Sequence, residues 1–370
     1  MSDGPSNLAD DFPAVPRNRV SSLLLAAALA AAVAVPAWAA EEGGDSGEIS
    51  LAAESETSGA RAPWRGSEVS YRNVVSLVTL DPSAELTWNP YYAMEWGFKP
   101  RWWLDDHWYV GARLDVAREL TQSDDTTDAG EAWLGDLLLV TGASRIVTIP
   151  WVDIDVSADL ILTTPTSKIS QARTLALGIG PGVRLARSFD GGGEWQLGYH
   201  VRFSSFLHRM TTAELETPLV PSCTRSGNGC DSFLNTGVRN VQWRVQQGVD
   251  LSYEPLEWLT LSAAFEHIVD WLYPIESDDP RVSFGVDSPT DQRHASAFGF
   301  EVTFVPLPAM ELGVGYETIS PQLAPDSTYF NPFYNRYSTI YLDLRLEIDG
   351  LVAQLTGEEA APSDAGPGGD

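Results

Sequence analysis

The sequence predicts one all-β domain, a transmembrane antiparallel up-and-down β-barrel of about twelve strands. Three observations predict it: long segments that alternate apolar and polar residues, connections that alternate between short and long, and aromatic residues gathered beside the short connections. The chain has 370 residues, of which 44% are hydrophobic, and a formal net charge of −28. Such modest hydrophobicity fits a barrel because only every second residue of a strand faces lipid.

The first 39 residues have the features of a secretory signal peptide. Thirteen consecutive Leu, Ala and Val residues run from Leu23 to Val35, after Arg17 and Arg19. A membrane-spanning helix needs about 20 apolar residues, so this run is too short to be one. The small residues that close it in Ala37-Trp38-Ala39 predict cleavage after Ala39.

Two polar segments flank the patterned region. Residues 40–70 are rich in Glu, Gly, Ser and Ala, and they predict a flexible acidic lead-in in the periplasm. Residues 350–370 end in GEEAAPSDAGPGGD and predict a disordered tail. The barrel is therefore expected over residues 71–349.

Within that region the apolar residues recur with a period of two. Ten segments show this cleanly: 92–102, 108–116, 152–162, 175–185, 195–203, 243–253, 259–269, 298–304, 310–316 and 340–348. Residues 71–81 and 132–147 are apolar enough for strands, although the face of each residue is ambiguous. Together they give twelve strands, most of them long enough to cross a bilayer at a tilt.

The connections between these segments alternate in length. The short ones are at 105–106, 149–150, 191–193, 255–256 and 306–308, and the long ones are near 82–89, 121–131, 163–171, 209–238, 272–293 and 320–336. Short periplasmic turns on one rim and long extracellular loops on the other are typical of outer-membrane barrels. With twelve strands, both termini are expected in the periplasm.

Aromatic residues cluster beside the short turns. They are Trp102, Trp103, Trp108, Tyr109, Trp151, Trp195, Tyr253 and Trp258. Trp and Tyr settle where a membrane meets water, so these residues predict a periplasmic aromatic girdle. A soluble sandwich or lipocalin-like barrel would also alternate, but it would not place its aromatic residues in this way.

On these features the chain resembles bacterial outer-membrane β-barrels of the porin-like, small-channel class. The resemblance covers residues 71–348 and concerns architecture, without a match to a specific family. It implies residence in the outer membrane of a Gram-negative bacterium, contact with membrane lipid and lipopolysaccharide, and insertion by the barrel-assembly machinery. The last strand ends Leu346-Glu347-Ile348 before a polar tail, whereas such barrels usually end on an aromatic residue.

If the apolar face meets lipid, the opposite face lines the interior, with fourteen carboxylates against seven cations. The candidate pore-lining residues are Glu95, Arg113, Asp115, Asp159, Arg202, Arg244, Glu266, Glu317 and Asp343. Glycines on the inner face leave space for a passage. The sequence thus predicts a passive pore for small polar or cationic solutes. The alternative is a closed barrel, held by ion pairs, with a structural or surface-interaction role.

Other functions find less support in the sequence. The acidic balance excludes a nucleic-acid partner that binds through phosphates. We found no histidine pair with metal-ligand spacing and no phosphate-binding glycine loop, so no cofactor is expected. His200 and Ser204 share the inner face, which is the wrong side for a lipid substrate. His208 and His294 lie at the outer rim near Asp291, where a catalytic site is a weaker hypothesis than histidines that are simply solvated. No catalytic role is predicted.

The two cysteines lie in the longest loop. Cys223 and Cys230 flank Arg225-Ser226-Gly227-Asn228-Gly229. In an exported protein such a pair predicts a disulfide that staples the loop tip.

Overall fold

The computed structural model describes residues 62–80, 90–121, 130–213, 238–274, 291–323 and 328–356. Its strands are β1 Glu68–Ser76, β2 Tyr92–Lys99, β3 Arg101–Trp103, β4 Trp108–Glu119, β5 Ala132–Leu134, β6 Leu137–Ile149, β7 Ile154–Thr164, β8 Leu175–Asp190, β9 Glu194–His208, β10 Val241–Leu256, β11 Leu259–Leu272, β12 Gln292–Leu307, β13 Met310–Pro321 and β14 Thr339–Glu347. Short helices are α2 Leu77–Leu80, α3 Lys168–Ala172 and α4 Ile348–Thr356.

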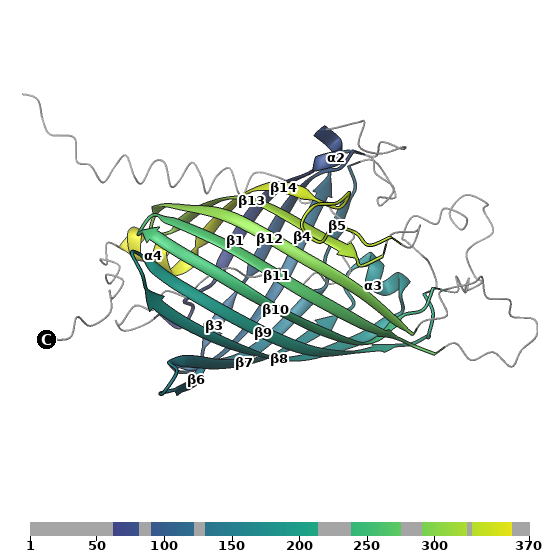
Figure 1. The fold of residues 1–370 in the computed structure, drawn as a ribbon, viewed down its shortest axis with the longest axis horizontal. Coiled ribbons are helices and arrows are strands. Elements are labelled where there is room, and N and C mark those ends of the chain that lie inside the picture. The colour runs from purple at the N-terminus through teal and green to yellow at the C-terminus, as the bar shows by residue number, and fades with distance from the viewer. Residues whose placement is uncertain are drawn as a thin grey trace, which may run out of the picture. The chain divides into compact units, whose positions relative to one another are not determined.

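These strands form one closed antiparallel barrel (Figure 1). Neighbours in sequence are neighbours in the sheet, and β1 closes the barrel by pairing with β14 from Glu68–Glu347 to Ser76–Thr339. β2 and β3 are one wall strand interrupted at Pro100, and β5 and β6 are another, so the wall contains twelve strands. The predicted fold class and strand number are confirmed.

The limits of the barrel differ from the prediction at both ends. Residues 68–70, assigned to the lead-in, pair with β2 and β14, so the wall begins at Glu68. Residues 350–356, assigned to the disordered tail, belong to α4. Gly350 lets α4 approach the β12–β13 turn, since a Cβ there would lie 2.5 Å from the Pro308 carbonyl oxygen. The expected signal peptide lies outside the described residues.

The outer surface of the wall is apolar. Large exposed side chains include Phe98, Val110, Val183, Leu197, Val201, Phe203, Val249, Phe300, Leu312, Val314 and Leu342. Their sequence neighbours on the inner face are polar or small, as the alternation predicts. None of the helices in the described part of the chain is both long enough and apolar enough to cross a membrane.

Most of the predicted aromatic girdle lies on the outside, with two exceptions. Trp102, Trp108 and Trp258 are exposed beside the short turns. Trp103 is buried, and its ring lies 5.1 Å from that of Tyr109. Both have the opposite parity to their neighbours Trp102 and Trp108, so they point inward. Their assignment to the girdle was wrong because adjacent residues of a strand face opposite sides.

The two rims differ as predicted. Short turns and α4 lie at one end of the barrel, while α2 and α3 lie at the other (Figure 1). In the turn between β3 and β4, Asp105 Oδ1 accepts hydrogen bonds from the backbone N–H groups of Trp108, at 2.7 Å, and His107, at 2.8 Å. These bonds stabilise the carboxylate and lower the pKa of Asp105 below its usual value.

Candidate functional site

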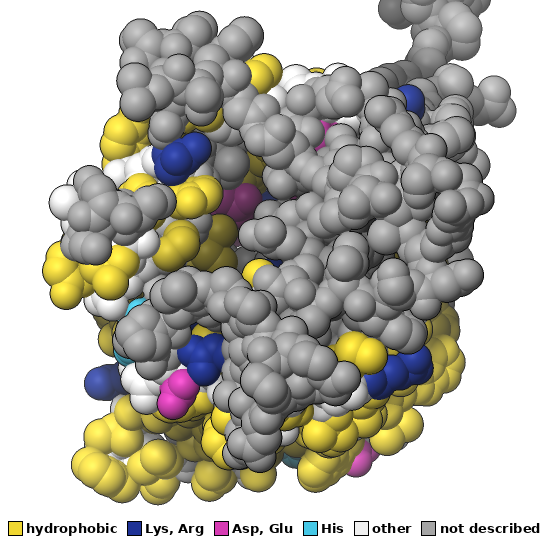
Figure 2. Space-filling model, turned by 90° about the vertical axis from the view of Figure 1, so that its right-hand side faces the viewer, with side chains coloured by type: hydrophobic (Ala, Val, Ile, Leu, Met, Phe, Trp, Pro, Cys, Tyr) yellow, Lys and Arg dark blue, Asp and Glu magenta, His cyan; other side chains and the backbone are white. Residues whose placement is uncertain are grey.

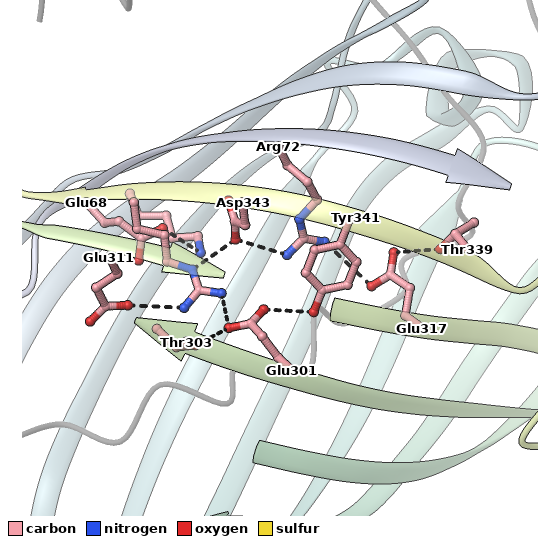
Figure 3. Close-up of polar contacts among 11 residues, drawn as sticks. Glu68, Arg72, Glu301, Thr303, Glu311, Glu317, Thr339, Tyr341 and Asp343 are labelled. Carbon is pink, nitrogen blue, oxygen red and sulfur yellow. Dashed lines mark hydrogen bonds and ion pairs between the residues drawn. The ribbon is translucent and has the colours of Figure 1, made fainter. Parts of the chain in front are cut away.

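Side chains inside the barrel form two polar networks, and the first centres on Arg345 of β14. Its Nη1 lies 3.2 Å from Glu311 Oε2, its Nε lies 2.9 Å from Asp343 Oδ2, and its Nη2 lies 2.5 Å from Glu301 Oε1. These carboxylates come from β12, β13 and β14. One guanidinium therefore links three neighbouring strands. Figure 3 shows Glu301, Glu311 and Asp343 converging on it.

Arg72 of β1 extends this network across the barrel closure. Its guanidinium lies 3.5 Å from carboxylate oxygens of both Asp343 and Glu317, and 4.2 Å from the centre of the Tyr341 ring. Tyr341 Oη donates a hydrogen bond of 2.8 Å to Glu301 (Figure 3). Glu301 and Asp343 are almost completely buried. The charges of these two carboxylates are tolerated there because guanidinium groups lie beside them.

The second network joins β8, β9, β10 and β11. Arg184 donates two hydrogen bonds to Asp250, from Nη1 at 2.9 Å and Nη2 at 2.6 Å. His200 lies between two carboxylates, with Nδ1 3.8 Å from Asp250 and Nε2 3.2 Å from Glu266. Gln246 donates to the other oxygen of Glu266 at 3.1 Å. Four adjacent strands are thus tied together on the inner face.

Further ion pairs connect strands around this inner wall. Arg202 of β9 reaches Asp159 of β7 at 2.7 Å. Arg244 of β10 makes two hydrogen bonds to Asp270 of β11, at 2.6 Å and 3.0 Å.

Inner glycines make these long-range contacts possible. Gly182 lies between Asp159 and Arg202 in the strand register, and a Cβ there would be 2.6 Å from the Asp159 carboxylate. A Cβ at Gly315 would overlap the Tyr341 ring, which crosses that glycine to reach Glu301. The expectation that inner glycines leave open space is wrong at these positions, because side chains from neighbouring strands fill it.

All nine residues that the sequence proposed as pore-lining lie on the inner face. Six contribute directly to contacts already described: Arg202, Asp159, Arg244, Glu266, Glu317 and Asp343. Of the other three, Arg113 lies 2.7 Å from Asp115 on the same strand, and Glu95 lies opposite Arg72 in the register.

Several members of the networks were not among those nine candidates. They are Arg72, Arg184, His200, Asp250, Glu301, Glu311, Tyr341 and Arg345. Arg72 was missed altogether because the sequence did not settle which residues of 71–81 face inward. The signal that would have found it is the register, which places it opposite Asp343.

Solvent reaches the inner wall unevenly. Inner side chains of β10, β11 and β12 are buried, including Gln246, Ser262 and Thr303. By contrast, the side chains of Arg184 on β8, Asp115 on β4 and Glu317 on β13 are 33%, 40% and 43% exposed, although all three lie on the inner face. Figure 2 looks at the end of the barrel with α2 and α3 and shows acidic side chains among the described residues there. The solvated part of the interior therefore borders β4 and β7–β9 and reaches Glu317 on β13.

The remaining histidines occupy separate places. His208 contacts the carbonyl oxygen of Arg173 at 2.7 Å, and His267 and His294 stack with ring centres 5.5 Å apart. Asp291, which the sequence placed near the rim histidines, instead pairs with Arg239 at 2.7 Å. Within the described ranges, no three His, Cys, Asp or Glu side chains form a group suited to a metal ion. Cys223 and Cys230 lie outside the described residues, and their disulfide stays a prediction.

No protein-family model matches the chain, and no curated protein matches it. Solved structures do match, and they include outer-membrane channels and porins. An outer membrane channel from Pseudomonas putida F1 aligns with 10% identity and a TM-score of 0.46, over 78% of this chain and 97% of that one. The NanC porin aligns with 9% identity and a TM-score of 0.40, over 75% of this chain and 98% of that one.

LpxR from Salmonella typhimurium also aligns, with 10% identity and a TM-score of 0.35, over 76% of this chain and 99% of that one. At these scores the likeness is one of barrel architecture. What this chain does must follow from its own side chains.

Proposed function

We propose that this protein is a passive pore for small polar solutes in the outer membrane of a Gram-negative bacterium. The observation that carries the proposal is the solvent exposure of charged side chains inside a closed barrel, seen at Arg184 and Asp115. A barrel filled by its own side chains would bury these groups. Charged groups that line a water-filled passage are the means by which such barrels select solutes.

The outer wall supports the membrane location. Phe300, Leu312 and Val314 are exposed on consecutive strands, and Val314 is 52% exposed. A large continuous apolar surface is unusual on a soluble protein but is required of a wall that meets lipid. In the proposed orientation the short turns and both termini lie in the periplasm, and the long loops face outward.

The proposed pore has a weak preference for cations. The sequence places fourteen carboxylates and seven cations on the inner face. Five of those carboxylates, but only one of the cations, are buried: Glu119, Asp250, Glu266, Glu301, Asp343 and Arg244. A solute in the pore meets fewer of the buried charges. The excess of carboxylates over cations that it meets is therefore smaller than the fourteen against seven counted in the sequence. Arg72 reduces this excess further.

The second candidate function is a closed barrel with a structural or surface-interaction role. The buried polar layer on β10–β12 favours it, because that part of the interior is already packed. We propose no enzymatic activity: His200 is held between Asp250 and Glu266, and so serves an ion-pair network.

Swelling of proteoliposomes distinguishes the two functions. Liposomes that contain the folded protein should swell in isotonic arabinose, and lysine should enter only slightly faster than glutamate. A barrel that gives no swelling above empty liposomes would contradict the pore and favour the closed barrel.

A matched pair of variants tests the path of the solute. Ser157 lies on the inner face of β7 beside the solvated region, and Ala158 is the next residue, facing outward. Ser157→Trp should slow arabinose entry, whereas Ala158→Trp should leave it unchanged. Equal effects from the two variants would contradict the proposed path.

A further inference from the structure

The connection between β13 and β14 carries five aromatic residues within residues 328–338. These residues, here named the aromatic collar, are TYFNPFYNRYS and contain one charged side chain, Arg336. They lie at the end of the barrel with the long loops. The collar belongs neither to the interior networks nor to the proposed pore.

The collar packs on the outside of the barrel wall. The Phe333 ring lies 5.1 Å from that of Phe298 and 6.0 Å from that of Phe265, measured between ring centres. Phe265 and Phe298 pair across β11 and β12, and they have the same parity as the exposed Phe300. Phe333 therefore extends the apolar outer surface.

Polar groups of the collar face the wall or each other. Asn335 donates from Nδ2 to Ser320 of β13 at 3.1 Å, and Tyr316 Oη lies 2.8 Å from Ser338 Oγ. Ser320 and Ser338 are almost completely buried as a result, together with Thr318.

Backbone donors of the collar are satisfied locally as well. The N–H of Phe333 bonds to Asn331 Oδ1 at 2.9 Å, and the N–H of Tyr337 bonds to Asn335 Oδ1 at 2.8 Å. A segment that lies in lipid must satisfy its backbone in this way because no water is available to do so.

The outward side of the collar is aromatic. Tyr334 is 62% exposed and Phe333 is 54% exposed, and Tyr329 and Tyr337 are exposed too. In the collar, polar groups point toward the wall and aromatic groups point away from it. A loop that faces water has the opposite arrangement. The arrangement of the collar is that of a segment at a membrane interface, where Tyr is enriched.

Beside the collar, the wall is short at β14 and β1. β14 and β1 contain nine residues each, whereas β10 and β12 contain sixteen. Nine residues rise about 30 Å along the strand and about 21 Å across a membrane at a tilt of about 45°, against an apolar band of about 25 Å. β13 continues for four residues beyond its last pairing with β14, and the collar covers this extension.

We propose that the aromatic collar completes the lipid-facing wall above β14, with its aromatic side chains among the acyl chains and head-group boundary of the outer leaflet. The partner is the lipid surface, because the collar continues the apolar wall and carries one charge. This inference rests on the membrane location proposed above.

Spin-label accessibility tests the inference. In a Cys223→Ser and Cys230→Ser background, a nitroxide is attached to Tyr334→Cys and the protein is placed in vesicles of phosphatidylethanolamine and phosphatidylglycerol. Collisions with oxygen report lipid, and collisions with a nickel chelate report water. Leu312→Cys on the outer wall and Asp106→Cys in a short turn provide the two references.

The oxygen-to-nickel ratio at Tyr334→Cys should match that of Leu312→Cys and exceed that of Asp106→Cys several-fold. A ratio like that of Asp106→Cys would place the collar in water and overturn the inference. Low access to both reagents would overturn it too, by indicating a second copy or another protein segment as the partner. If Tyr334→Cys does not fold, Tyr337→Cys serves the same purpose.

The references separate this inference from the proposed function. A nickel-accessible label at Leu312→Cys would contradict the membrane-spanning wall itself. A lipid-exposed label at Leu312→Cys together with a water-exposed label at Tyr334→Cys would contradict the collar alone.

Discussion

Replacing Gly315 with alanine should destabilise the barrel through the Tyr341 ring. A Cβ at this position overlaps the ring that crosses Gly315 to reach Glu301. Overpacking of this kind costs about 1–3 kcal/mol. Displacing the ring also breaks the hydrogen bond of 2.8 Å to the buried carboxylate, which costs about 1.5–3 kcal/mol more. The expected loss in the free energy of unfolding is therefore about 2.5–6 kcal/mol.

Equilibrium urea unfolding in lipid vesicles measures this loss, and a second background makes the test specific. Tyr341→Leu removes the ring, so Gly315→Ala in that background should cost much less than in the native chain. A similar cost in both backgrounds would show that the ring contact does not cause the effect. A native-background loss below about 0.5 kcal/mol, typical of an unconstrained surface site, would refute the reasoning as well.

Three further predictions concern the wall, the interior and a turn. If the exposed side chain of Val314 faces lipid, Val314→Arg should lower the free energy of unfolding in vesicles by about 2–4 kcal/mol. A loss below about 0.5 kcal/mol, which is typical of a water-exposed surface site, would indicate that this position faces water. Arg345→Gln should cost about 3–5 kcal/mol because it leaves Glu301 buried without its closest guanidinium, and adding Glu301→Gln should recover part of that loss; no recovery would count against the pairing. Asp105→Ala should lower the unfolding midpoint near pH 7. The pKa of Asp105 is lowered by folding, so its contribution is present above the usual value of 3.8 and disappears as pH falls through the lowered pKa. The unfolding midpoints of wild type and variant should therefore approach each other as the pH is lowered.

The fold was predictable because strand periodicity is local. A period of two identifies each wall strand, and the alternation of turn lengths gives the connectivity. Where that pattern fails, so did the prediction. In β1, Val74 points inward and is buried, and its neighbour Val75 is also apolar. Two adjacent apolar residues do not show which face of the strand is the inner one, so the sequence did not reveal that Arg72 points inward.

Contacts inside the barrel depend on register, which the sequence does not reveal. An inner glycine can be identified as a missing side chain, but not as the place where Tyr341 or Asp159 crosses to another strand. Pairs such as Arg184 and Asp250 are 66 residues apart and meet only because two hairpins align them. The aromatic collar was overlooked for a different reason. Long connections are usually solvated, and its aromatic composition alone did not reveal that it folds onto the wall.

The central claim is that water and small solutes pass through the solvated part of the interior, which borders β4 and β7–β9 and reaches Glu317 on β13. Single-channel recording of the purified, folded protein in a planar bilayer tests it most directly. The protein should produce discrete conductance steps in potassium chloride, with a reversal potential that shows weak cation preference under a salt gradient. A correctly folded protein that inserts and yet gives no steps would contradict the claim.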